Sequence, residues 1–369
     1  MDPARPYQGR LRNRKSHATC LIINVIAVNR RRRIHCISVG LLLVGLGMVV
    51  SAGGAVAQKG AGVSQIRGGV SIIDTATNRL ATGTIKTGRF PSAIALGPGG
   101  DRAYVVNAGG LHGGNVSVID TASSRVTVRA IAVGRFPEQI AISPDGLRAY
   151  VADSGSNAVS VIDTEANELA AKPISVGRVP IAIAVSPDGG RIYVSNAGSD
   201  TISVIDTATD KPATRPIKVG GYPLAIAITP DGSRVYVANV RDDTVSAIDT
   251  AAIGQPVKTI KTDDTPSAIA ISPDGRLVYV ANARDDTLSV ITAATNRPAS
   301  KPIKVCGRPT AVAISPDGDR AYVSCLASGT VSTINTVTSK PAAKPIKVGP
   351  FPLGLAVSPD GSRVYVVKN

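Results

Sequence analysis

Residues 141–153 read AISPDGLRAYVAD, and six further copies of this stretch occur along the chain. They are ALGPGGDRAYVVN from residue 95, AVSPDGGRIYVSN from 184, AITPDGSRVYVAN from 227, AISPDGRLVYVAN from 270, AISPDGDRAYVSC from 313 and AVSPDGSRVYVVK from 356. The first two copies are 46 residues apart, and every later interval is 43 residues. Seven copies at this period indicate a repeat architecture.

Each repeat contains four segments that have the composition of strands. The Ser-Pro-Asp-Gly tetrapeptide joins two apolar segments, and it is a turn sequence because Pro sets φ for a turn and Gly accepts positive φ. A segment such as VSVIDT and a segment such as IKVG complete the repeat, again seven times each. The enrichment in Val, Ile, Thr and Tyr favours β structure. One repeat therefore predicts four antiparallel strands, which we call a, b, c and d.

The order of these segments predicts how the chain closes. The repeat region begins with c and d at about residues 68–88, continues with six full a-b-c-d units, and ends with a and b at 353–367. We expect an all-β, seven-bladed β-propeller with four antiparallel strands per blade. One blade is split, with inner strands from the C-terminus and outer strands from the N-terminus, and this pairing closes the ring.

The first 57 residues differ from the rest. The stretch NRRRRIHCISVGLLLVGLGMVVSAGGAVA, residues 29–57, has a basic run, an apolar run and a small-residue end, as a secretory signal has. We therefore predict a leader at 1–57, a propeller at 58–369 and export to the periplasm, cell wall or extracellular space. A twin-arginine route and an uncleaved leader that anchors the protein to the membrane stay open.

Charge and histidine content limit the chemistry. The formal net charge is +15, and residues 1–57 carry nine basic residues and one acid, so the leader accounts for about half of it. The remaining excess favours either an anionic partner or an ordinary solvated surface. His112 is the only histidine after the leader. Because no histidine cluster exists for a metal or for a nucleophile–base pair, we expect no cofactor, no metal site and no catalytic residue.

The d-a loops carry the candidate ligand-binding residues. They read GRFP, GRFP, GRVP, GGYP, DDTP, GRP and GPFP. Arginine beside an aromatic ring is suited to stacking and to anion contact. The candidates are Arg89, Phe90, Arg135, Phe136, Arg178, Tyr222, Arg308 and Phe351. The alternative is that each ring fills the gap between adjacent blades.

Two smaller sets of residues are weaker candidates. Paired acids in the b-c and d-a loops would form an acidic patch or a calcium site, although Arg241 and Arg284 beside them also fit a neutralised surface. These acids are Asp242, Asp243, Asp263, Asp264, Asp285 and Asp286. Cys306 replaces the Gly that ends strand d in most repeats, and Cys325 ends the YVSC copy of the following strand b. A disulfide between them is one interpretation, and two independent thiols are the other.

The repeated segments AYVVN, AYVAD, IYVSN, VYVAN and AYVSC, with SPDG and VSVIDT around them, resemble the YVTN β-propeller repeat family over about residues 65–369. The resemblance implies the propeller fold and export. Related propellers include lactonases and quinone-dependent dehydrogenases, but the family has no single catalytic motif to transfer, and fold alone does not give function.

Three hypotheses about function follow. The first is an exported, non-catalytic and monomeric propeller that binds a protein or an envelope polymer through its b-c and d-a loops. The second is a lactonase-like hydrolase. The third is a propeller that binds nucleic acid through the Arg/Phe ring. The near-identity of the repeats favours the first hypothesis.

Overall fold

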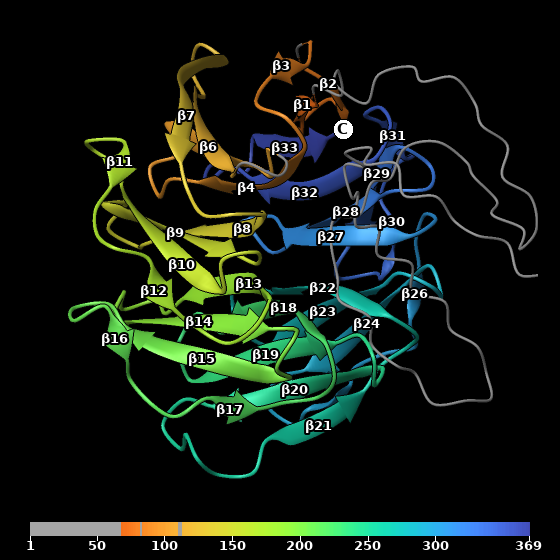
Figure 1. Ribbon diagram of the computed structural model, residues 1–369. Helices are drawn as coiled ribbons and strands as arrows, with labels where there is room; N and C mark the ends of the chain where they lie inside the picture. Colours follow the sequence, from red (N-terminus) through yellow and green to blue (C-terminus); the bar gives the residue numbers. More distant parts are fainter. Residues whose placement is uncertain (1–67, 82, 110–112) are drawn as a thin grey trace, which may run out of the picture. The chain divides into compact units, whose positions relative to one another are not determined.

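The computed structural model describes residues 68–81, 83–109 and 113–369, and every regular element in them is a β-strand. The predicted leader and His112 lie outside the described residues. The described residues belong to one compact unit. It is a ring of seven antiparallel sheets, as the sequence predicted (Figure 1).

The two inner strands of every blade are six residues long. The innermost strands are β4 (Pro91–Leu96), β8 (Pro137–Ile142), β13 (Pro180–Val185), β18 (Pro223–Ile228), β22 (Pro266–Ile271), β27 (Pro309–Ile314) and β32 (Pro352–Val357). The second strands are β5 (Arg102–Asn107), β9 (Arg148–Asp153), β14 (Arg191–Asn196), β19 (Arg234–Asn239), β23 (Leu277–Asn282), β28 (Arg320–Cys325) and β33 (Arg363–Lys368).

The third strands are equally regular, whereas the outermost strands are not. The third strands are β1 (Gly69–Asp74), β6 (Asn115–Asp120), β10 (Ala158–Asp163), β15 (Thr201–Asp206), β20 (Thr244–Asp249), β24 (Thr287–Thr292) and β29 (Thr330–Asn335). Five outermost strands are broken in two: β2 (Arg79–Leu80) with β3 (Ile85–Lys86), β11 (Glu168–Leu169) with β12 (Ile174–Ser175), β16 (Lys211–Pro212) with β17 (Ile217–Lys218), β25 (Arg297–Pro298) with β26 (Ile303–Lys304), and β30 (Lys340–Pro341) with β31 (Ile346–Lys347). The other two are β7 (Arg125–Ala132) and β21 (Lys258–Lys261).

Proline explains most of these breaks. Segments such as KPATRPIK and RPASKPIK carry two prolines, which donate no ladder hydrogen bond and are tolerated only at a sheet edge. β7 has no proline and runs unbroken for eight residues. The described residues therefore form 33 strands in seven blades, because the predicted strand d is split into two short strands in five of the blades.

The ring closes through the split blade. β1 pairs with β33 over six residues, from Gly69↔Lys368 to Asp74↔Arg363, and the sheet order is β2-β1-β33-β32. We number the blades 1 to 6 from β4, β8, β13, β18, β22 and β27, and the split blade is blade 7. The guanidinium of Arg320 in blade 6 donates to the carbonyl oxygen of Thr75 in blade 7 at 3.0 Å. Closure thus unites both ends of the described chain in one sheet.

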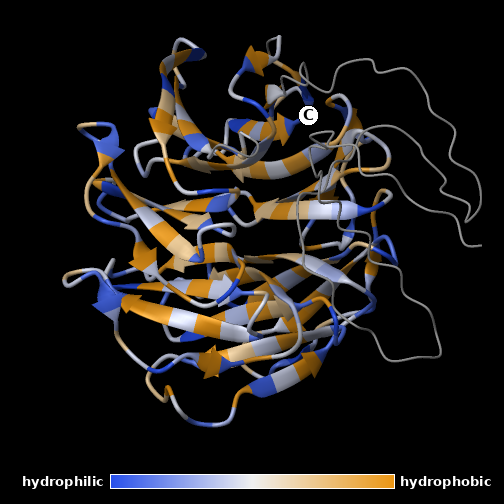
Figure 2. Ribbon diagram, in the orientation of Figure 1, coloured by the Kyte–Doolittle hydropathy of each residue, from blue (hydrophilic) through white to orange (hydrophobic). Residues whose placement is uncertain are grey.

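The core lies between neighbouring blades. Each second strand contributes a buried tyrosine, and Val, Ile and Ala from the adjoining sheets pack around it. Hydrophobic colour accordingly follows the strands, and hydrophilic colour is concentrated in the connections (Figure 2). Because the core is made of repeated aliphatic layers, individual positions in the connections are free to differ between blades.

Candidate functional site

The connections lie on two different faces of the ring. On one face the b-c loops bond to the d-a loops: the N–H of Ala108 donates to the carbonyl of Phe90 at 2.9 Å, and the N–H of Ser154 donates to the carbonyl of Phe136 at 3.0 Å. We call this the loop face. On the other face Thr121, which follows strand c, donates through Oγ1 to the carbonyl of Gly100 in the a-b turn at 2.7 Å. We call this the turn face.

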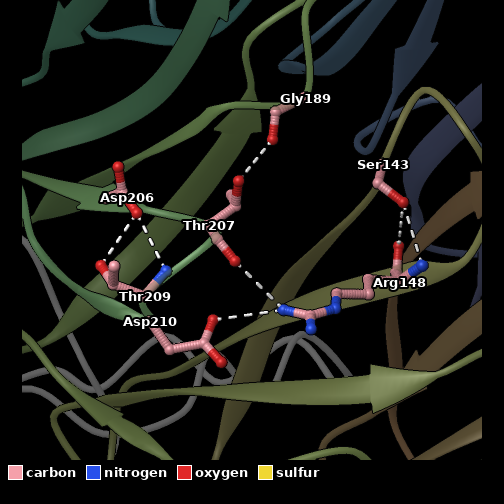
Figure 3. Close-up of polar contacts among 7 residues, drawn as sticks. All are labelled: Ser143, Arg148, Gly189, Asp206, Thr207, Thr209 and Asp210. Atoms are coloured by element: carbon pink, nitrogen blue, oxygen red, sulfur yellow. Dashed lines mark hydrogen bonds and ion pairs between the residues drawn. The ribbon is translucent and has the colours of Figure 1, made fainter.

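The turn face explains why the Ser-Pro-Asp-Gly and Ile-Asp-Thr motifs recur. In blade 2, Ser143 Oγ contacts the Asp145 carboxylate. The same hydroxyl accepts a hydrogen bond from the N–H of Arg148 at 2.9 Å (Figure 3). The guanidinium of Arg148 donates to the carbonyl of Thr207 in blade 3 at 3.2 Å. In blade 3, Asp206 accepts from the N–H of Thr209 at 2.9 Å and so caps the c-d turn. These motifs hold turns and neighbouring blades together.

The cavities of this face repeat with the blades. A cavity of 440 Å³ lies between blades 2 and 3, where Arg148 and Tyr150 line it. An equivalent cavity of 210 Å³, lined by Arg363 and Tyr365, lies between blades 7 and 1. The same residue types line both, so the cavities follow from the repeat and do not indicate a specific site.

On the loop face, the residue before the loop proline has a left-handed backbone in all seven d-a loops. Its φ lies between 47° and 63°, a region that is unfavourable for aromatic and β-branched residues. The residues are Phe90, Phe136, Val179, Tyr222, Thr265, Arg308 and Phe351. Each ring or side chain is therefore held in a fixed direction by the loop.

The structure brings the predicted Arg/Phe residues onto this face in neighbouring loops. The Arg89 guanidinium lies 5.8 Å from the centre of the Phe90 ring, and the Arg135 guanidinium lies 5.9 Å from that of Phe136. Arg178 donates instead to the carbonyl of Gly198, from Nε at 3.2 Å and from Nη2 at 2.8 Å. All three arginines are exposed.

The other candidates lie farther round the same face. Arg308 occupies the left-handed position itself, so it is equivalent to Phe90 and not to Arg89. Tyr222 and Phe351 occupy this position in the loops that lead into β18 and β32, and both side chains are half-buried. The eight candidates thus lie in six of the seven d-a loops. Within the described chain, no acid forms an ion pair with Arg89, Arg135, Arg178 or Arg308.

The acids of the Arg-Asp-Asp loops cap backbone groups. Asp242 accepts a hydrogen bond from the N–H of Gly221 at 2.6 Å, and Asp243 accepts one from the N–H of Thr265 at 2.9 Å. Ser156 and Asn157 form the same two kinds of bond in blade 2. Burial and the nearby Asp264 and Asp285 charges raise the pKa of Asp243.

The remaining acids are engaged in similar contacts. Asp285 and Asp286 accept from the N–H groups of Asp264 and Arg308 at 2.8 and 2.7 Å. Asp263 accepts from Thr287 Oγ1 at 2.7 Å, and Asp264 pairs with Arg284 at 3.3 Å. No group of three or more His, Cys, Asp or Glu side chains within the described ranges is arranged to hold a metal ion.

A buried contact between the d-a loop and strand b joins neighbouring blades. In blade 1, the N–H of Gly88 donates to Asn107 Oδ1 at 3.0 Å, and a Cβ on Gly88 would lie 2.5 Å from the Asn107 side chain. We call this contact the Asn–Gly latch. Asn196 and Asn239 pack against Gly177 and Gly220 in the same way, but their Oδ1 atoms accept no hydrogen bond.

A disulfide replaces the latch between blades 5 and 6. Cys306 occupies the Gly position and Cys325 the Asn position, their Cα atoms lie 5.7 Å apart, and a disulfide bond joins them. A Cα separation of this size is typical of a disulfide. The Gly position also accepts a side chain opposite a full Asn, because Asp263 stands opposite Asn282 in blade 5.

The family comparison agrees with this architecture. The model of the YNCE-like beta-propeller family matches residues 55–357. The chain belongs to this family. The YVTN name for its repeat stays a prediction. No curated protein matches the chain in sequence.

Solved structures similar to this YNCE-like propeller show the fold alone. Kuenenia stuttgartiensis hydrazine synthase matches with a TM-score of 0.66 and 24% identity, over 78% of this chain and 94% of that chain. A protein of unknown function from Desulfotomaculum acetoxidans DSM 771 matches with a TM-score of 0.64 and 18% identity, over 75% and 94%. Among the described residues of the propeller, no helix is long and apolar enough to cross a membrane.

Two carboxyl groups of blade 2, those of Asp153 and Glu138, were not predicted from the sequence. Asp153 stands where other blades have the latch Asn, is fully buried, and accepts from Ser160 Oγ at 2.6 Å. Burial raises its pKa to about 6. Glu138 stands on the innermost strand β8 and accepts from Ser154 Oγ at 3.0 Å. Comparing equivalent positions between the repeats, instead of searching for motifs, would have revealed both.

Proposed function

We propose that this protein is an exported, non-catalytic binding propeller of the cell envelope, and that its loop face binds an anionic envelope polymer. One observation carries the proposal. Three consecutive d-a loops each present an exposed arginine that forms no ion pair, and these are Arg89, Arg135 and Arg178. Three neighbouring blades supply these cations, so the arrangement suits a ligand with several negative charges along its length.

The backbone of these loops favours binding because it is ordered before the ligand arrives. Ser156 and Ser199 accept from the N–H groups of Arg135 and Arg178 at 2.8 and 2.7 Å. The Phe90 and Phe136 rings give Arg89 and Arg135 a surface to lie on. Preorganised side chains lose less conformational entropy on binding.

The arginines of the b-c loops in blades 4 and 5 differ from these three, because acids already pair with them. There Arg241 and Arg284 lie close to Asp200 and Asp264, at 3.8 and 3.3 Å. These charges are already balanced, and an anion would gain little from them. The hydrolase hypothesis needs acids that are available for chemistry, and the paired acids are instead engaged with loop backbone and side chains. We therefore do not propose hydrolysis.

The disulfide supports export. Disulfides persist in oxidising compartments and are rare in the cytosol, and the Cys306–Cys325 bond joins two blades of the ring. The basic and apolar pattern of residues 29–57 is the second line of support.

The test is a binding titration with poly(glycerol phosphate) and poly-L-glutamate as envelope-polymer probes and oligo(dT) as the nucleic-acid probe. The triple variant R89A/R135A/R178A should weaken polymer binding by at least about tenfold, since charge-assisted contacts contribute more than neutral ones. The control R125A/R129A/R215A removes three exposed arginines from elsewhere on the chain.

Equal weakening by both triple variants would mean that only net charge matters, and unchanged affinity in R89A/R135A/R178A would exclude this site. Binding of oligo(dT) alone would favour the nucleic-acid hypothesis. Specific binding should also weaken as salt concentration rises, because exposed charges are screened.

A further inference from the structure

Blade 2 departs from the repeat at two adjacent positions of its innermost strand. The second residue of this strand is a hydroxyl or an aliphatic residue in six blades, and it is Glu138 in blade 2. The six are Ser92, Ile181, Leu224, Ser267, Thr310 and Leu353. The third residue is Ala or Gly in six blades and Gln139 in blade 2. A residue that a fold needs in every blade is repeated, so a single carboxyl group here calls for a separate explanation.

The backbone places Glu138 at the loop-face end of the innermost strand. A β-bulge between Pro137 and Gln139 interrupts the pairing of β8 with β9, so Glu138 is the unpaired residue of the bulge. The same bulge occurs at the start of the other innermost strands, so it belongs to the fold, and only the carboxyl group placed on it is particular to blade 2. The Gln139 side chain accepts from the N–H of Ile183 in blade 3 at 2.8 Å, which fixes the neighbouring residue.

The Glu138 carboxylate is under-partnered. Ser154 Oγ, 3.0 Å away, is its hydrogen-bond donor, and this hydroxyl also lies 2.9 Å from the carbonyl of Phe136. An ionised carboxylate accepts about four hydrogen bonds. No Lys or Arg of the described chain forms an ion pair with it. Burial raises the pKa of Glu138, and only the Ser154 hydroxyl opposes this effect.

An aromatic ring lies close to the same loop. A Cβ on Gly155 would lie 2.5 Å from the Phe136 ring, so this ring packs against the residue that follows Ser154. The carboxylate at the start of β8 and the aromatic ring of the preceding d-a loop are complementary to a positive charge. Arg135, whose guanidinium lies over Phe136, has an exposed side chain and does not reach the carboxylate.

We propose that Glu138 binds the positively charged group of a ligand, an ammonium or a guanidinium, that approaches the ring from the loop face. Ser154 orients the carboxylate, and Phe136 contributes the apolar wall beside it. The two proposed sites use different charged groups, although Phe136 lies at both, so each site is tested with its own charge substitution. A metal ion fits less well, because Glu138 belongs to no group of three ligating side chains in the described ranges.

The experiment is a calorimetric titration of the full chain near pH 7.5 with two kinds of cation. Butylammonium and butylguanidinium represent free organic cations, and the capped tripeptides Gly-Lys-Gly and Gly-Arg-Gly represent a side chain of a protein partner. Butanol and butyramide are the neutral controls. We expect saturable binding of at least one cation and no binding of the neutral compounds. Tighter binding of a free cation would indicate a small ligand, and tighter binding of a tripeptide would indicate a protein partner.

Three variants make the assignment specific. Glu138→Gln should weaken cation binding by at least about tenfold, as expected for loss of a charged partner. Glu138→Ser installs the residue that blades 1 and 5 carry at this position, so it retains the fold and should also lose binding. Glu168→Gln removes an exposed carboxylate on β11 and should leave binding unchanged.

Acidification should weaken binding to the wild type at a pH above that at which an ordinary glutamate is protonated, because burial raises the pKa of Glu138. The proposal is overturned by the absence of saturable binding for all four cations, or by equal affinity in wild type and Glu138→Gln. Loss of polymer binding in R89A/R135A/R178A with retained cation binding would separate this site from the proposed function.

Discussion

The two faces of the propeller use the repeat differently. On the turn face the same bonds recur: Thr121, Thr164 and Thr207 each donate through Oγ1 to a glycine carbonyl of the a-b turn. On the loop face the backbone conformation recurs, but the side chains on it change from blade to blade. Positions that hold the ring together are therefore repeated, and positions that recognise a partner are the ones that the repeat leaves free.

The latch of the loop face shows both behaviours at one position. The Asn–Gly pair of blade 1 becomes Asp153 against Gly134 in blade 2, a disulfide between blades 5 and 6, and Lys368 against Gly349 in blade 7, and the two members always come from neighbouring blades. Substitutions at the latch should therefore have effects that depend on the blade, and substitutions on the turn face should not. Three predictions test this contrast.

The largest effect is expected for the disulfide. Reduction, or the single substitution Cys325→Ala, should lower the free energy of unfolding by about 3 kcal/mol, because the bond closes a loop with a sequence separation of 19. Urea denaturation with and without reductant measures the loss. The double variant C306G/C325N restores the Asn–Gly latch of blade 1 and should recover part of the stability without responding to reductant. A reductant effect in this double variant would contradict the assignment.

The intermediate effect concerns Asp153. Burial raises its pKa in the folded protein to about 6 from the ordinary value of 3.8, so the folded state binds the proton more tightly than the unfolded state. The stabilisation is therefore complete below about pH 4 and is lost as the pH rises through 6. Asp153→Asn should stabilise the protein by about 2 to 3 kcal/mol near pH 7.5 and by little at about pH 3.5, because the amide is buried without charge.

Asn also fits the surroundings of Asp153. In blade 4 the Asn239 amide donates to Ser246 Oγ at 2.9 Å, and Ser160 occupies that place in blade 2. Urea denaturation at the two pH values measures the difference, and Asp101→Asn, at a side chain that is 73% exposed, is the control. A stabilisation that does not change with pH would mean that the buried charge is not its cause.

The sequence predicted the fold in detail, because strand composition, turn chemistry and a constant period all agree. The copy number gave seven blades, and the incomplete first and last repeats gave the split blade, which β1 and β33 form. The breaks in the outer strands were missed, although the prolines in segments such as KPATRP were visible. Their effect depends on which strand lies at the sheet edge.

The site was predictable only in part. The repeat predicts that Arg89, Arg135 and Arg178 lie on one face, because they occupy equivalent positions in successive d-a loops. The capping role of Asp243 depends on the left-handed backbone at this residue and on the approach of Thr265, 22 residues later, and neither is evident without coordinates. Glu138 was overlooked because it belongs to no motif; it is recognisable only as an exception to the repeat.

The smallest effect is expected on the turn face. Thr207→Val removes the bond from Oγ1 to the Gly189 carbonyl, which is 2.7 Å long, and should cost about 1 kcal/mol, the net value of an ordinary hydrogen bond. Thr121→Val in blade 1 should cost the same, because Thr121 forms the same bond to Gly100. Blade 5 carries Ala293 at the equivalent position, so Ala293→Thr should instead stabilise the protein by a similar amount. Thermal and urea unfolding of the three variants measures these differences. If the two Thr→Val variants differ by as much as the latch variants do, the turn face is as blade-specific as the loop face, and the division of roles between the faces fails.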